Sequence, residues 1–200
     1  MTALRRPLVA LAAALALAPR LAAQNPRFDF YARGPYRAEV PRPATLLGYE
    51  PGEFHTNYGN MERVVQAIAQ AAPDRVRVMT YGRSEERRTL YLIAVSSPEN
   101  IRRLDEIRAQ TARLADPRTT APADAQAIIQ GLPATVWLNY ANDGNESAAF
   151  EAAIQVLWQL AASNEPATLE ILRNAVVLIN PAHNPESHER FVAWYNAFGT

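Results

Sequence analysis

Hydrophobic residues recur with helical or strand periods along most of the chain. In residues 58–71 they recur at intervals of three and four, which predicts a helix that ends before Pro73. Residues 75–81 alternate polar and apolar positions, and residues 89–96 are apolar and rich in β-forming types, so both are predicted strands. A charged turn at residues 82–88 joins these strands, and we therefore expect a β-hairpin.

The remainder of the chain alternates predicted helices and strands. These elements are a helix from Ser97 that ends at Pro117, a brief helix at residues 124–130, a strand at residues 134–140, a helix after Glu146, a short helix around residues 167–173 and a strand at residues 175–180. The last strand is continuously apolar, as is typical of a central strand buried on both faces. A hairpin followed by strand, helix and strand predicts the α/β class, with a mixed β-sheet flanked by helices.

Residues 1–23 have the layout of a secretory signal peptide. Arg5 and Arg6 form a positive start, residues 7–18 are almost entirely Ala, Leu and Val, and small residues precede Gln24. The apolar stretch is shorter than the ~20 residues that a membrane-spanning helix needs. We therefore expect export, a secreted or periplasmic location, and no integral membrane protein after cleavage. An uncleaved N-terminal anchor or a buried helix is the alternative.

Residues 24–46 are rich in Pro, Arg and aromatic residues and show neither helical nor strand period. They are predicted to form an extended arm that packs its aromatic side chains onto the domain surface. Residues 47–200 are predicted to form the domain itself.

Several function classes are excluded by composition. The formal net charge is +0, so no basic excess indicates nucleic acid as a partner. There is no Cys, which excludes thiol nucleophiles, disulfide bonds and cysteine-based zinc sites. Neither a Gly-rich phosphate loop nor a Gly-x-Ser-x-Gly nucleophile elbow occurs in the sequence.

Two carboxylates mark the junction between a predicted strand and a predicted helix. Residues 136–151 run from an apolar strand through a polar turn into an amphipathic helix, and Asp143 and Glu146 lie at the turn. The carboxyl end of a strand in an α/β sheet is where ligands and catalytic groups collect. Helix capping is the alternative interpretation, since Asp and Asn are favoured N-caps and an acid in the first turn suits the helix dipole.

The turn sequence Asp143-Gly144-Asn145-Glu146-Ser147 matches a metal motif that reads His-x-x-Glu, often His-Gly-Asn-Glu-Ser, except that Asp143 replaces the His. Residues 180–196 match a segment written Asn-Pro-x-x-Asn-Pro-Asp-Gly-Arg-Asp-Arg-Tyr-x-x-Trp-Tyr-Asn. In this chain Glu186-Ser187-His188-Glu189 replaces Asp-Gly-Arg-Asp. Through these motifs the chain resembles the zinc carboxypeptidase family, the carboxypeptidase A-like metallopeptidases.

Two further segments extend the resemblance, which covers about residues 44–200 in the family's order. Residues 47–60 resemble the loop that leads into the family's first helix. Residues 81–92 resemble its hairpin, Gly-x-Ser/Thr-x-Glu-Gly-Arg-Pro-Leu, with Glu86-Arg87-Arg88 where Glu-Gly-Arg is common. The resemblance implies a mixed sheet flanked by helices, which agrees with the periodicity.

The resemblance also implies a zinc chemistry. In the family, one zinc ion is held by two His and one Glu and polarises a water, a second Glu is the general base, and an Asn-Arg pair binds the terminal carboxylate of the substrate. Only the positions of the first two ligands, Asp143 and Glu146, fall within this chain. The third ligand, the base and the Asn-Arg pair are expected beyond Thr200. We therefore expect a domain truncated at its C-terminus, with no catalytic residue of its own.

The replacement at Asp143 changes the expected metal site. Zinc accepts carboxylate oxygen, so Asp143 is a candidate ligand beside Glu146. Because Asp is shorter than His and makes a harder, oxygen-rich site, we expect weaker zinc binding and competition from metals that prefer oxygen. His183 and His188, in the predicted loop after the last strand, are either solvated or placed to replace the missing imidazole, and His55 is expected to be structural.

Two functions are compatible with these residues. The first is an exported zinc metallocarboxypeptidase that hydrolyses C-terminal peptide bonds of peptide or protein substrates with a metal-activated water. The second is a catalytically degenerate relative that acts as a binding or structural domain, which the replacements at Asp143 and Glu186-Ser187 favour. Arg190 is either a binding group for anionic parts of the substrate, because guanidinium pairs with carboxylate in a bidentate fork, or part of a surface salt bridge.

Overall fold

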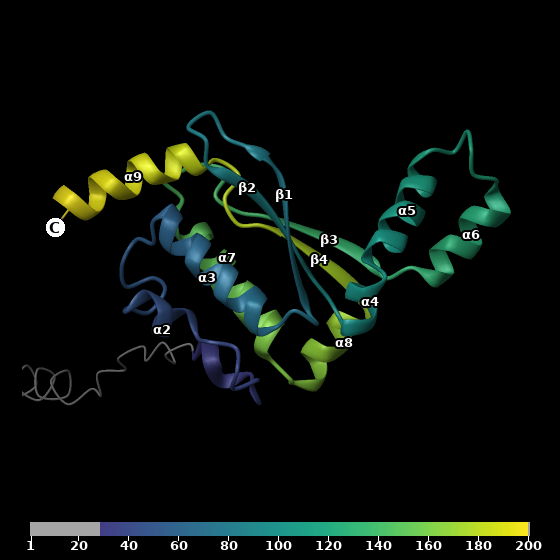
Figure 1. Ribbon diagram of the computed structural model, residues 1–200, viewed down its shortest axis with the longest axis horizontal. Helices are drawn as coiled ribbons and strands as arrows, with labels where there is room; N and C mark the ends of the chain where they lie inside the picture. Colours follow the sequence, from purple (N-terminus) through teal and green to yellow (C-terminus); the bar gives the residue numbers. More distant parts are fainter. Residues whose placement is uncertain (1–28, 200) are drawn as a thin grey trace, which may run out of the picture. The chain divides into compact units, whose positions relative to one another are not determined.

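A computed structural model describes residues 29–199. The predicted signal peptide lies outside these residues. The chain divides after Ala32 into two units, and η1 (Phe30–Ala32) belongs to the first. In chain order the elements of the second unit are α2 (Pro43–Leu47), α3 (Tyr58–Ala71), β1 (Val76–Arg83), β2 (Thr89–Val95), α4 (Pro98–Arg102), α5 (Leu104–Ala115), α6 (Pro122–Gly131), β3 (Ala134–Asn139), α7 (Ser147–Ala162), α8 (Pro166–Asn174), β4 (Ala175–Asn180) and α9 (Pro185–Phe198) (Figure 1).

The four strands form one mixed sheet in the order β1-β2-β4-β3. The hairpin β1–β2 and the pair β2–β4 are antiparallel, whereas β3 and β4 are parallel. This arrangement confirms the predicted α/β class and the predicted hairpin. Because β3 and β4 are parallel with Asn139 opposite Asn180, their carboxyl ends lie side by side. The loops that follow them, which carry Asp143, Glu146 and His183, therefore begin at the same edge.

Helices pack against both faces of the central strands, whereas β3 is largely exposed. In β2 and β4, Ile93 pairs with Ile179 and Ala94 pairs with Leu178, so alternate positions face opposite sides. Ala94 belongs to a buried cluster with apolar side chains of α4 and α5. Helices α3 and α7 contact each other and the strands (Figure 1). As predicted, β4 is almost wholly buried.

Local chemistry fixes the ends of these helices. The Asn57 side chain accepts a hydrogen bond from the backbone N–H of Asn60 and caps the start of α3. At the C-terminal end of α7, the buried guanidinium of Arg75 donates to the carbonyl oxygens of Ala161 and Ser163. A cation there satisfies terminal carbonyls and complements the helix dipole. No helix within residues 29–199 is long and apolar enough to cross a membrane.

Three local predictions are wrong. The helix expected from Ser97 to Pro117 is two helices, α4 and α5, which meet at Arg103. The arm expected to be extended contains the short helices η1 and α2. Its Tyr36 does pack on Trp158 of α7, with ring centroids 4.5 Å apart. The segment after β4, expected to be a loop, is mostly the helix α9.

Candidate functional site

The turn that carries Asp143 and Glu146 connects β3 to α7. Both residues are exposed, and the backbone N–H of Glu146 donates to the carbonyl oxygen of Asp143 at 3.1 Å. Glu146 is the N-cap residue of α7, but neither its side chain nor that of Asp143 caps the helix. Helix capping therefore does not explain why carboxylates stand at these positions. Before the turn, Ala141 has a φ of 51°, a conformation that costs a residue with a Cβ about 1–2 kcal/mol.

Gly144 fixes the middle of this turn against the start of α9. Its N–H donates to the hydroxyl of Ser187 at 3.2 Å, and its carbonyl oxygen lies 3.2 Å from Nδ1 of His188. A Cβ at residue 144 would lie only 2.0 Å from the carbonyl carbon of Ser187. Only glycine fits at this contact, so the turn between the two carboxylates is held in one place by backbone as well as side-chain contacts.

His188 is fully buried beneath the turn. Its ring stacks on Phe150 with centroids 3.7 Å apart, and Nε2 lies 2.9 Å from the carbonyl oxygen of Thr56. Burial lowers the pKa of His188, although the carbonyls of Thr56 and Gly144 oppose that shift. The neutral ring donates its one proton at the shorter Nε2 contact. Both nitrogens are thus occupied by backbone carbonyls, and His188, which is neither in a loop nor solvated, does not replace the missing zinc ligand.

A second polar cluster lies at the carboxyl ends of β3 and β4. The amide nitrogen of Asn180 lies 2.9 Å from Oδ1 of Asn139, 3.2 Å from the hydroxyl of Tyr81 and 3.3 Å from Nδ1 of His183. Asn180 is 1% exposed, whereas His183 and Tyr81 are exposed. The amide has two protons for these three contacts, and Asn139 Oδ1, the nearest acceptor, takes one of them.

The charged side chains near α9 pair among themselves. Ser84 and Arg88 both donate to the carboxylate of Glu186, and these hydrogen bonds lower its pKa although burial opposes the shift. Arg190, the candidate for binding substrate anions, forms an ion pair with Glu86 and is otherwise exposed. In the structure Arg190 therefore forms a surface salt bridge, which was the alternative to binding anionic parts of the substrate.

A pocket of about 570 Å³ lies on another side of α7. It is bounded by the loop that includes Phe54 and His55, by α7 and by Tyr195 of α9. His55 meets the rings of Phe191 and Tyr195 edge-on, with centroids 5.6 and 4.6 Å away, so its role is packing. Glu151, which also borders the pocket, accepts hydrogen bonds from both the N–H and the hydroxyl of Thr56. Burial raises the pKa of this carboxyl.

A sequence model of the family described as Peptidase_M14, zinc carboxypeptidase, matches residues 61–194. The chain belongs to the zinc carboxypeptidase family. The match includes both positions of the metal motif, the β1–β2 hairpin and most of α9. Comparison with curated protein sequences finds no significant match.

Solved carboxypeptidase structures are also similar to this chain. Thrombin activatable fibrinolysis inhibitor is 14% identical over 68% of this chain and 27% of its own, with a TM-score of 0.48. A metallo-carboxypeptidase from Burkholderia cenocepacia is 20% identical over 70% of this chain and 30% of its own, with a TM-score of 0.45. Carboxypeptidase A from Helicoverpa armigera is 15% identical over 73% and 31%, with a TM-score of 0.48. The chain spans less than a third of the length of these three proteins.

The zinc that the family implies does not fit the residues described here. A family site needs three protein ligands, and a catalytic zinc keeps a further position for water. Asp143 and Glu146 supply two carboxylates, but no group of three His, Asp or Glu side chains within residues 29–199 is placed to hold a metal ion. His188, within α9, faces the backbone carbonyls of Thr56 and Gly144, and His183, just before α9, lies 3.3 Å from the amide nitrogen of Asn180. In this part of the zinc carboxypeptidase chain, the metal motif is therefore an incomplete ligand set.

Sequence reasoning missed the cluster formed by Tyr81, Asn139, Asn180 and His183. One signal was present, because Asn180 ends a predicted strand, Asn139 stands one residue before the end of another, and such ends collect ligands. The contribution of Tyr81 had no signal, since it depends on an irregularity in the pairing of β1 with β2. The helix α9 did have a start signal in Asn184-Pro185-Glu186, with Asn184 as the N-cap.

Proposed function

We propose that this protein binds peptides at the carboxyl edge of its sheet, and that the 200-residue chain does not hydrolyse them. The observation that carries this proposal is the state of the metal motif in a family whose members are carboxypeptidases. Asp143 and Glu146 are exposed there, and residues 29–199 offer no third ligand. The turn held by Gly144 supports the proposal, because it keeps this edge in a fixed position where a peptide could bind.

The second candidate is the family's own reaction, the hydrolysis of C-terminal peptide bonds. The match to the family across residues 61–194, with Glu146 retained at its ligand position, favours this function. It would require a third ligand and a general base that the described residues do not provide. General-base catalysis alone contributes about a hundred- to ten-thousand-fold, so a chain without it is expected to be inactive.

One experiment separates the two candidates. The purified chain is titrated calorimetrically with benzoyl-Gly-Phe, first in EDTA and then with added zinc, and free Phe is measured by chromatography. We expect binding in both conditions and no release of Phe. Zinc-dependent release of Phe would establish the second candidate instead, and absence of both binding and release would remove peptides as the ligand. Metal analysis of the purified protein, expected to show less than one equivalent of zinc, is the independent check.

We further propose that the protein is exported. The sequence of residues 1–23 supports this location, with its positive start, apolar core and small residues before Gln24. Mass spectrometry of the protein recovered from culture medium or periplasm is expected to give an N-terminus near Gln24 or Asn25. Recovery of intact Met1 in that fraction would contradict cleavage.

A further inference from the structure

The pocket beside α7 is lined by groups that suit a positively charged ligand. Its volume of about 570 Å³ lies within the range of about 300–1,000 Å³ that is typical of ligand sites. Its charged lining residues, Glu53 and Glu151, are both acidic. No Arg of the described residues lines it, and the chain has no Lys. The charge of the pocket therefore favours a cation and disfavours a carboxylate.

Glu151 brings a buried carboxylate to the wall of this pocket. The residue is only 6% exposed, and its two oxygens accept hydrogen bonds from the N–H and the hydroxyl of Thr56, at 2.7 and 2.9 Å. Thr56 is itself fully buried, and the hydroxyl of Tyr49 donates to the Thr56 hydroxyl at 3.1 Å. The carboxylate is therefore held in one position at the pocket wall.

No ion pair compensates the charge of Glu151 within residues 29–199. Thr56 is neutral, so its hydrogen bonds occupy lone pairs of the carboxylate but leave the net charge. Burial outweighs the opposing effects of Thr56 and the nearby His55, and it raises the pKa of the carboxyl. Buried charges are ordinarily paired as well as hydrogen-bonded. A cation in the pocket would supply the missing pair.

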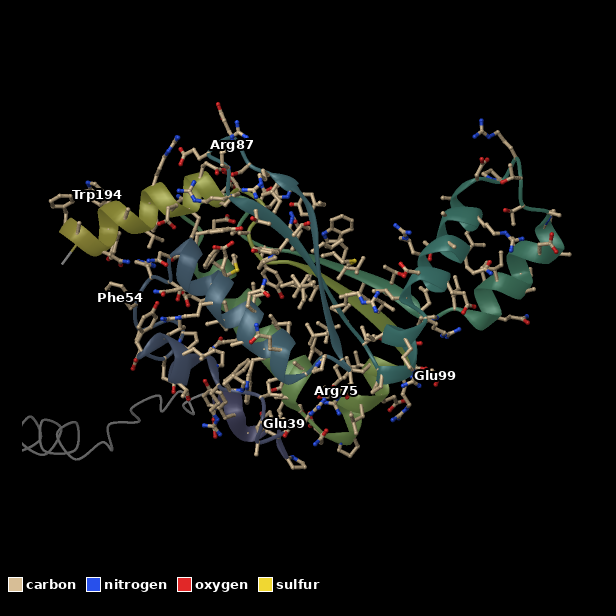
Figure 2. The ribbon with its side chains drawn as sticks, viewed as in Figure 1. Glu39, Phe54, Arg75, Arg87, Glu99 and Trp194 are labelled. Atoms are coloured by element: carbon tan, nitrogen blue, oxygen red, sulfur yellow. The ribbon has the colours of Figure 1, made fainter. Side chains whose placement is uncertain are left out.

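Two half-exposed aromatic side chains border the same pocket. Phe54, on the loop that leads into α3, is 49% exposed, and Tyr195 of α9 is 41% exposed (Figure 2). An aromatic face attracts a cation that lies within about 6 Å of the ring centre. The same rings offer apolar surface to a hydrocarbon stem. A buried acid beside aromatic rings therefore matches a ligand that has a cationic end and an apolar stem.

We propose that this pocket binds an organic cation, an ammonium or guanidinium group on an apolar stem, with the charge at Glu151 and the stem against Phe54 and Tyr195. Such a cation donates to the carboxylate lone pairs that Thr56 leaves free. A free amine and the basic side chain of a polypeptide both offer this chemistry. The lining shares no residue with the turn at residues 143–146, so the inference stands independently of the proposed peptide binding.

The test titrates the full ¹⁵N-labelled chain by NMR at pH 8, which favours the carboxylate form of Glu151. The probe is phenethylamine, and phenethyl alcohol offers the same ring and stem without the charge. We expect the amine to bind about tenfold more tightly, because hydrogen bonds between charged groups are stronger than neutral ones. The shift changes should lie at residues 51–56 and 147–155. Equal affinities, or shift changes confined to other residues, would overturn the proposal.

Glu151→Gln keeps the size of the side chain and removes its charge. It is expected to abolish the preference for the amine and to leave the affinity for the alcohol unchanged. Glu170→Gln is the matched control, since it removes an exposed carboxylate of α8 outside the pocket, and it should keep the preference. A preference that persists in folded Glu151→Gln would show that this carboxylate does not bind the cation.

Tyr195→Leu provides a second variant that does not alter the buried acid. Leucine keeps an apolar contact but has no aromatic face, so the affinity for phenethylamine is expected to fall about threefold. The affinity for phenethyl alcohol should change less, which separates the attraction of the cation from simple loss of packing. Unchanged affinity for the amine would contradict the proposed place of the ligand.

The source of the cation is distinguished by Nα-acetyl-lysine amide, which carries an ammonium group on a peptide backbone. Binding tighter than that of phenethylamine, and lost in Glu151→Gln, would support the basic side chain of a polypeptide as the ligand. Weaker binding would support a free amine. Absence of binding by all three probes would overturn the site. Failure of benzoyl-Gly-Phe alone would contradict the proposed peptide binding and would leave this site standing.

Discussion

Gly144 lies so close to Ser187 that a Cβ on residue 144 would be 2.0 Å from the Ser187 carbonyl carbon. This contact joins two of the places where the chain departs from its family's pattern. Asp143 replaces the family's first His, and Ser187-His188 stands where Gly-Arg is common. The Ser187 hydroxyl accepts a hydrogen bond from the N–H of Gly144, and the His188 ring lies 3.2 Å from the Gly144 carbonyl oxygen. The two departures are therefore physically coupled.

Gly144→Ala is expected to destabilise the fold by about 3 kcal/mol, because the added methyl would overlap backbone atoms that cannot move alone. The free energy of unfolding in urea measures this loss. Gly131→Ala is the matched control, since a Cβ there meets nothing within 4 Å, and we expect it to be neutral or slightly stabilising. A Gly144→Ala protein as stable as the control would show that the turn is not clamped.

Arg87 marks another departure, at the tip of the β1–β2 hairpin (Figure 2). It has a φ of 70° where the family commonly has glycine. Arg87→Gly is expected to raise the free energy of unfolding by about 1 kcal/mol, because glycine adopts this conformation without a steric cost. Arg87→Ala keeps the Cβ and should give no such gain. Equal stabilisation by both variants would assign the effect to loss of the guanidinium instead.

The fold was predictable because the spacing of apolar residues indicates most of its helices and strands. Helix α3 and strands β2 and β4 were placed within a residue or so, since apolar positions dominate their buried faces. Helix α9 was missed because its buried positions include His188 rather than a run of aliphatic residues, so no apolar period is visible. The break between α4 and α5 at Arg103 also had no Pro or Gly to signal it.

The site was less predictable, because its contacts join segments distant in sequence. That Asp143 and Glu146 share a turn could be read from the motif, but the burial of His188 under that turn could not. It depends on three partners from separate parts of the chain, Thr56, Gly144 and Phe150. The role of Tyr81 likewise depends on a bulge in strand pairing, which leaves no period in the sequence.

His188 is expected to make stability depend on pH near neutrality. Because burial lowers its pKa in the folded state below the ordinary 6.5, the unfolded chain binds a proton more readily. Stability is then complete above about pH 6.5 and falls as the pH drops toward the folded-state pKa. The measurement is the urea midpoint of unfolding between pH 5 and pH 8. His188→Phe should remove this component while costing about 1–3 kcal/mol at pH 8, since the Thr56 carbonyl loses its donor.

The carboxyl groups of Glu186 and Glu151 also make stability depend on pH, but in a different pH range or in the opposite direction from His188. Glu186, whose pKa is lowered from 4.5, contributes stability that is lost only as the pH falls below that value. Glu151, whose pKa is raised, loses stability as the pH rises above 4.5, opposite to the effect of His188. The difference between the pH profiles of the wild type and His188→Phe isolates the contribution of His188. A flat wild-type profile near pH 6 would contradict the assignment.

Asp143→His is expected to raise the affinity of the chain for zinc by about tenfold or more, because imidazole nitrogen suits zinc better than a single carboxylate oxygen. Gly144 already holds the turn in place, so the new side chain starts from a fixed backbone. Asp143→Asn is the control that removes the charge without adding imidazole, and it should bind zinc no better than the wild type. Calorimetric titration with zinc compares the three proteins. Tighter binding by Asp143→His alone indicates that the chain descends from a metal site that lost its first ligand. Tight binding by the wild type that Asp143→His weakens would show instead that Asp143 is an adapted metal ligand and that residues beyond those described complete its site.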